Sequence, residues 1–124
     1  MTKQIIVNFV KQEEMREDFW LGDYYMKDGK LIFDIVDSGS DFTNKRYLVH
    51  ELIEQMLTEY SGITEKEIHK FDKQFDKECK LGIHSEDAEP GDSPDCFYRR
   101  QHQFAMLVEG LLLNFIDKDT NCYG

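Results

Sequence analysis

The chain has 124 residues, of which 40% are hydrophobic and 13% aromatic, and these values suit one globular domain with one core. Its 25 Asp and Glu against 15 Lys and Arg give a formal net charge of −10, which repels phosphate backbones and argues against direct nucleic-acid binding. No apolar run approaches the roughly 20 residues that span a bilayer, and the first residues, MTKQIIVNFVKQEE, lack the apolar core of a signal peptide, so we expect one cytoplasmic domain over residues 1–124 with no membrane partner.

The first 40 residues predict a strand followed by a β-hairpin. Residues 5–10 are rich in β-prone side chains, and the charged segment 11–20 fits either a short helix or an irregular connection. Asp28-Gly29 stands between two β-prone runs, at residues 21–27 and 30–36, which is a strong hairpin signal. Alternate residues of a strand share a face, so we expect one apolar set of the second run to pack on helices: Leu31, Phe33 and Ile35.

Two helices are expected next, each with an apolar stripe at helical spacing. The first extends from residue 41 or 43 to residue 60, and its predicted buried stripe is Val49, Leu52, Ile53, Met56, Leu57 and Tyr60. The second begins with a capping box of Thr64 and Glu67. Its predicted buried face carries Ile68, Phe71, Phe75 and Cys79.

A third helix is expected after a polar loop at residues 80–92. Ser93 suits the N-cap and Pro94 the first helical position, and the helix should continue to about residue 115. Its apolar stripe is Phe104, Ala105, Val108, Leu111, Leu112 and Phe115. The predicted fold class is therefore α+β, with an N-terminal strand and a β-hairpin packed against three α-helices.

The first helix carries the pattern His50-Glu51-x-x-Glu54. Side chains four residues apart project from the same side of a helix, so His50 and Glu54 could bind one metal ion. The pattern resembles the metalloprotease helix motif H-E-x-x-H, with Glu54 at the place of the second histidine. The sequence therefore predicts a metal site here, whereas the departure at Glu54 argues against the peptidase reaction.

The other two helices supply further candidate ligands. His102 flanks the stripe of the third helix, and Asp72 falls within the apolar face of the second, where a carboxylate is costly unless it is paired or bound to a cation. We expect His50, Glu54 and His102 to be metal ligands, with Asp72 as a fourth ligand or as a partner that orients one. Glu51 would be the general base for a metal-bound water.

The chemistry of these candidate ligands limits which metal ion the site could bind. Two imidazoles and carboxylates without a thiolate suit Zn²⁺ best, with Fe²⁺ or Mn²⁺ as alternatives. The three cysteines lack C-x-x-C spacing and indicate reduced thiols.

Each candidate also has a purely structural interpretation. A His-x-x-x-Glu pair arises by chance in acidic helical proteins, and His102 could be a hydrogen bonder at a helix edge. Asp72 could pair instead with a cation, for which the candidates are Arg46, Lys70 and Arg99.

Over residues 20–124 the chain resembles a group of small uncharacterised proteins of bacteriophages and bacterial genomes. The segments that carry this resemblance, besides the hairpin, are Val49-His-Glu-Leu-Ile-Glu54, Gly62-Ile-Thr, Phe71-Asp72, Glu89-Pro-Gly-Asp92 and Tyr98-Arg-Arg-Gln-His102. The resemblance implies a phage setting, hence the host cytoplasm, and implies no particular reaction. A narrower resemblance to zincin metalloproteases covers the strand and the first helix, and it implies His50 as a ligand and Glu51 as the base.

Two hypotheses for the function follow. The first is a small metal-binding protein with a zincin-like helix, extending to a metal-dependent hydrolase. The second is a non-enzymatic acidic protein that binds or inhibits a basic surface of a host protein, which the net charge of −10 would favour.

Overall fold

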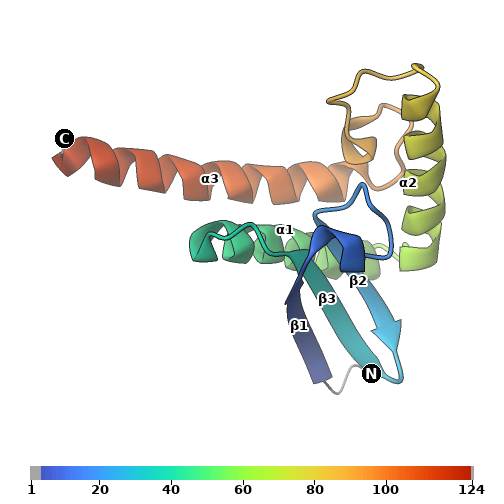
Figure 1. The fold of residues 1–124 in the computed structure, drawn as a ribbon, viewed down its shortest axis with the longest axis horizontal. Coiled ribbons are helices and arrows are strands. Elements are labelled where there is room, and N and C mark those ends of the chain that lie inside the picture. The colour runs from blue at the N-terminus through green and yellow to red at the C-terminus, as the bar shows by residue number, and fades with distance from the viewer. Residues whose placement is uncertain (1–3, 124) are drawn as a thin grey trace.

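The computed structural model describes residues 4–123 and the side chains of residues 4–117. In that part of the chain a small sheet precedes three α-helices, as predicted (Figure 1). The elements in chain order are β1 (Gln4–Val10), a short 3-10 helix (Gln12–Glu14), β2 (Gly22–Lys27), β3 (Lys30–Val36), α1 (Asp41–Tyr60), α2 (Glu65–Lys80), a second 3-10 helix (Pro90–Asp92) and α3 (Arg99–Tyr123).

The sheet has the strand order β1-β3-β2, with β1 parallel and β2 antiparallel to β3. Asp28 and Gly29, with φ of 53° and 76°, form the tight turn between β2 and β3, because a type I′ turn needs positive φ at both central residues. Phe33 and Ile35 are fully buried, so the predicted inward face of β3 is confirmed.

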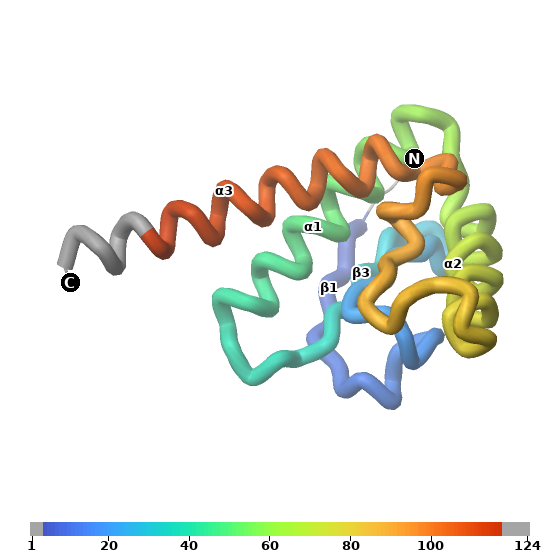
Figure 2. Tube along the Cα trace, turned by 90° about the horizontal axis from the view of Figure 1, so that it is seen from above, coloured from blue at the N-terminus to red at the C-terminus, as the bar shows by residue number. Residues whose placement is uncertain are grey.

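The helices lie on one side of this sheet. α1 crosses β2 and β3, α3 runs alongside α1, and α2 stands at one end of the layer (Figures 1 and 2). The core beneath them joins the sheet to α2 and to the segment before α3, and its buried members are Tyr24, Leu31, Phe33, Ile35, Ile68, Cys96 and Tyr98.

The prediction that the apolar stripe of α1 is its buried face is wrong. Met56 and Tyr60 are 55% and 91% exposed. The side chains that α1 buries are polar, namely Asn44, His50, Glu54 and Thr58. The reason is that α1 lies against both the sheet and α3, and the surfaces that meet there pair polar groups with one another.

The predicted start of α3 is also wrong. The helix begins at Arg99, whereas Ser93 and Pro94 lie in turns before it, and it continues past residue 115 to Tyr123. Those turns place Cys96 and Tyr98 in the core, so burial of these two side chains overrides the local start signal. Among the described helices, none has the length and apolar composition that crossing a membrane requires.

The N-cap that Thr64 was predicted to form at the start of α2 is confirmed and can be tested. The hydroxyl of Thr64 accepts a hydrogen bond of 3.2 Å from the backbone N–H of Glu67. Thr64→Ala should lower the free energy of unfolding by about 1 kcal/mol, because one helix donor loses its partner. Urea denaturation would measure this, and Thr64→Ser should stay near wild type because it keeps the hydroxyl.

Candidate metal site

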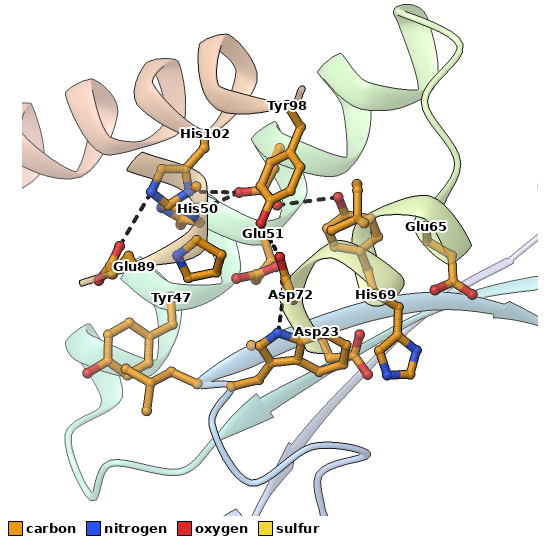
Figure 3. Close-up of a pocket in the computed structure, with 18 of the residues that line it drawn as sticks. Asp23, Tyr47, His50, Glu51, Glu65, His69, Asp72, Glu89, Tyr98 and His102 are labelled. Atoms are coloured by element: carbon orange, nitrogen blue, oxygen red, sulfur yellow. Dashed lines mark hydrogen bonds and ion pairs between the residues drawn. The ribbon is translucent and has the colours of Figure 1, made fainter. Parts of the chain in front are cut away.

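Three of the predicted ligands converge between α1 and α3. Nε2 of His50 lies 3.2 Å from Oε2 of Glu54, and Nδ1 of His102 lies 3.1 Å from the same oxygen. All three side chains are buried, and their donor atoms form a group that could hold a metal ion (Figure 3). Ligands bound tetrahedrally at ~2.0–2.1 Å lie ~3.3 Å apart, so the three side chains are close enough to share one metal ion.

The second nitrogen of each imidazole faces another carboxylate. Nδ1 of His50 lies 2.7 Å from Oε1 of Glu109. Nε2 of His102 lies 3.4 Å from Oε2 of Glu89 (Figure 3). Neither contact has the alignment of a hydrogen bond, so both buried nitrogens lack a hydrogen-bond partner. Metal-binding histidines commonly face a carboxylate on the side away from the metal, which fixes the ring and its tautomer.

Glu89 and Glu109 were not among the predicted site residues. Glu109 lies two helical turns after His102, and that spacing was the one signal for it in the sequence. Glu89 precedes the second 3-10 helix, and its approach to His102 depends on how the loop folds back (Figure 3). Asp92, from the same loop, lies 3.7 Å from Nε2 of His102.

The neighbouring carboxylates and imidazoles of the site shift one another's pKa values so that each group favours its charged form. Burial lowers the pKa of His50, but the carboxylates of Glu109 and Glu54 reverse this and raise it to about 10. Burial likewise lowers the pKa of His102, whereas Glu54 and Glu89 raise it to about 9. Burial raises the pKa of Glu54, and hydrogen bonds from both imidazoles outweigh that effect and hold it below its ordinary value. Glu54 therefore stays ionised and attracts positive charge.

Two glycines make room for the site. A Cβ added at Gly91 would overlap the ring of His102, and one added at Gly22 would lie 2.5 Å from Cγ of Glu51. Neither glycine has a positive φ, so each is needed for close approach and not for backbone conformation. Nothing in the sequence alone distinguished them from the turn glycines.

Glu51 lies on the wall of a cavity of about 280 Å³ that also reaches His50, Glu54 and His102. In the described part of the chain no donor hydrogen-bonds to its carboxylate (Figure 3). Burial and the neighbouring charge of Glu54 raise the pKa of Glu51 to about 8. This carboxyl group can therefore hold or release a proton near neutral pH.

Asp72 lines the same cavity but is not among the converging ligand atoms. It accepts a hydrogen bond of 3.0 Å from Nε1 of Trp20 and a second from the hydroxyl of Tyr98 (Figure 3). Burial raises the pKa of Asp72 to about 7 although both donors oppose that shift. These two donors take the place of the cations that the structural interpretation had suggested, and Arg46 pairs instead with Glu109.

The two remaining histidines lie outside the group. His69 pairs with Glu17, and His84 pairs with Glu78 and stacks on Phe75. No protein-family model matches the chain, and no match was found among the curated proteins or the solved structures. The site must therefore be interpreted from its own geometry.

The role of Gly91 can be tested against another glycine. Gly91→Ala should lower the free energy of unfolding by about 1–3 kcal/mol, because the added methyl overlaps His102 and the loop must shift. Gly110→Ala is the control, since nothing lies near its Cβ position, and it should be neutral or stabilising by up to about 1 kcal/mol. Equal effects of the two substitutions in urea denaturation would contradict the tight contact with His102.

Proposed function

We propose that this protein binds one divalent metal ion through Nε2 of His50, a carboxylate oxygen of Glu54 and Nδ1 of His102. The observation that carries the proposal is the convergence of these three buried atoms while each imidazole has a carboxylate at its other nitrogen. Zn²⁺ suits two imidazoles and one carboxylate with an open position, and Fe²⁺ and Mn²⁺ accept the same set.

The proton content of the site supports a cation there. Two raised imidazole pKa values mean that protons compensate the charge of Glu54 near neutral pH. A divalent ion among the same three atoms would replace the protons on Nε2 of His50 and Nδ1 of His102, and metal binding would release them. Glu109 and Glu89 would then orient the two rings by accepting their remaining N–H groups.

We further propose that the site supports hydrolysis, with Glu51 as the general base. When bound, the metal would supply a water whose pKa is lowered towards ~7. Glu51 fits the role because its carboxylate faces the cavity, carries no hydrogen bond and has a pKa of about 8. The described residues that line the cavity include no lysine or arginine, which favours a neutral or cationic substrate over a phosphate ester.

Metal binding can be measured without knowledge of the substrate. Tag-free protein stripped with a chelator should bind close to one Zn²⁺ per chain in a calorimetric titration, with an increase in melting temperature. His50→Ala and His102→Ala should each weaken binding at least about 100-fold, and the double variant should lose little more, because ligands of one ion act together.

His84→Ala is the matched control, because this histidine also pairs with a glutamate but lies outside the site. It should keep wild-type affinity. Loss of binding in all three single variants, or in none of them, would rule out the proposed ligand set.

The carboxylates behind the histidines give a graded test. Glu109→Gln should weaken Zn²⁺ binding by about 10–100-fold, less than the loss of a ligand, because the amide oxygen can still accept from the N–H of His50 while the orienting negative charge is lost. An affinity unchanged by Glu109→Gln would show that this carboxylate does not serve the site.

The proposed role of Glu51 as a general base predicts a different result. Glu51→Gln should retain Zn²⁺ with near wild-type affinity and lose at least about 100-fold in any hydrolytic rate, because the amide cannot accept a proton. A panel of neutral and cationic ester and amide substrates would provide the rate. Weakened metal binding in Glu51→Gln would instead make Glu51 a ligand.

A further inference from the structure

The loop before α3 brings two carboxylates to the second nitrogen of His102. Nε2 lies 3.4 Å from Oε2 of Glu89 (Figure 3) and 3.7 Å from Oδ1 of Asp92, whereas Nδ1 of the same ring faces Glu54. The ligand atoms of Glu89, Asp92 and His102 lie within 4.8 Å of one another, and we call these three the outer group. Ligands of one ion bound at ~2.0–2.2 Å lie ~3.3–3.6 Å apart, so the outer group is close enough to share an ion.

The backbone of the loop holds the two carboxylates on one side. Glu89 precedes the second 3-10 helix and Asp92 ends it, and the backbone N–H of Asp92 donates a hydrogen bond of 3.2 Å to the carbonyl of Glu89. Side chains three residues apart across such a turn lie one above the other. Pro90 fixes its own φ within the turn, and Gly91 leaves room for the ring of His102. The local chain geometry therefore directs both carboxylates to the same nitrogen.

The role of orienting His102 does not account for this pair. One acceptor is enough to orient an imidazole, and Glu89 supplies it, so Asp92 is left over. In the described part of the chain, neither carboxylate pairs with a lysine or an arginine. Nε2 of His102 has no hydrogen-bond partner although the residue is only 7% exposed. A buried nitrogen without a partner, aimed at two carboxylates without a cation, marks a place for a positive ion.

The outer group differs from the proposed ligands in its access to solvent. His50, Glu54 and His102, whose converging atoms we call the inner ligands, are 8%, 6% and 7% exposed. The side chains of Glu89 and Asp92 are 56% and 50% exposed. Exposed carboxylates raise the local concentration of cations and can bind an ion that still keeps part of its water. A hydrated ion therefore meets the outer group before it meets the inner ligands.

We infer that the outer group is a second metal site, which takes a divalent ion from solvent and passes it to the inner ligands. This route rests on the proposed function, because the inner ligands are its destination. One imidazole nitrogen and two carboxylate oxygens, with water in the remaining positions, suit Zn²⁺ and also Fe²⁺ or Mn²⁺. His102 belongs to both sites and presents a different nitrogen to each.

The ring of His102 serves one ion at a time. A neutral imidazole has one proton and one free lone pair, so an ion on Nε2 leaves the proton on Nδ1, where Glu54 accepts it. When the ion moves to the inner ligands, Nδ1 gives up that proton, and Nε2 takes up one that Glu89 accepts. His50 releases its Nε2 proton to solvent in the same step. The chain therefore still holds one tightly bound ion at equilibrium.

Asp92→Asn tests the route, because Asp92 belongs to the outer group and is not needed to orient His102. A stopping place on a route lowers the barrier in both directions. Its loss should slow Zn²⁺ association and Zn²⁺ release into excess chelator alike, each by about tenfold, with an affinity near wild type. Stopped-flow fluorescence can follow both rates, since Trp20 is the one tryptophan and lines the cavity.

Asp87→Asn is the matched control. Asp87 is exposed in the same loop, and no contact in the described structure joins it to His102. It removes the same charge and should leave both rates near wild type. Equal effects of Asp92→Asn and Asp87→Asn would overturn the route. Slower association with unchanged release in Asp92→Asn would also overturn it, because that result is long-range attraction alone.

The outer group can also be measured apart from the inner ligands. His50→Ala disables the inner ligands and should keep weak Zn²⁺ binding, which isothermal titration calorimetry can detect. Adding Glu89→Gln and Asp92→Asn should abolish this residual binding, whereas adding Glu86→Gln and Asp87→Asn should preserve it. Circular dichroism would confirm that each variant is folded. Residual binding that survives the first pair would overturn the outer site.

The two proposals fail in different ways. A wild type without tightly bound Zn²⁺, whose weak binding still requires Glu89 and Asp92, would overturn the proposed function and leave the outer site standing. A wild type with one tightly bound Zn²⁺, whose rates do not change in Asp92→Asn, would overturn the route and leave the proposed function standing.

Discussion

The carboxylate of Glu54 is buried between two imidazoles, and much of the architecture depends on that arrangement. Its Oε2 contacts His50 one turn earlier on α1 and His102 on α3, while its Oε1 lies 3.4 Å from the hydroxyl of Tyr24 on β2. An unpaired buried charge would cost several kcal/mol, so Glu54 must keep these partners wherever α1 packs. One side chain thereby joins the sheet, α1 and α3, and it fixes how the two long helices lie together.

This constraint explains why α1 buries polar side chains and exposes apolar ones. The helix buries the polar groups that surround Glu54, and it turns Met56 and Tyr60 towards solvent. Burying polar and charged groups contributes less to stability than burying the apolar stripe would have done. Natural chains depart from simple patterning mainly at functional sites, and they compensate elsewhere.

Local signals in the sequence were sufficient for most of the fold. Asp28-Gly29 specifies its turn through positive φ, and Thr64 specifies the start of α2 through one hydrogen bond, so both could be predicted without tertiary information. The four-residue spacing of His50 and Glu54 on one helix likewise predicted that their side chains lie together. That His102 joins them depends on the packing of α3 on α1, and the sequence offered it as one expectation among alternatives. The stripe of α1 was misassigned because helical periodicity identifies an apolar face but not what covers it. Gly22 and Gly91 gave no signal, since their role is the space they leave for Glu51 and His102.

The two acidic groups with strongly raised pKa values in the cavity, Glu51 and Asp72, have different surroundings. Asp72 is held by Trp20 and by Tyr98, and Tyr98 lies one turn before His102 at the start of α3. A carboxyl group fixed by two donors positions its neighbours, and here it anchors the segment that delivers His102 to the site. That contact accounts for a carboxylate in the apolar stripe of α2 without any cation. Glu51 has no such donor in the described structure and faces open space beside the converging ligands. Under the proposed function, Glu51 is the group that would exchange a proton with a molecule in the cavity, whereas Asp72 positions Tyr98.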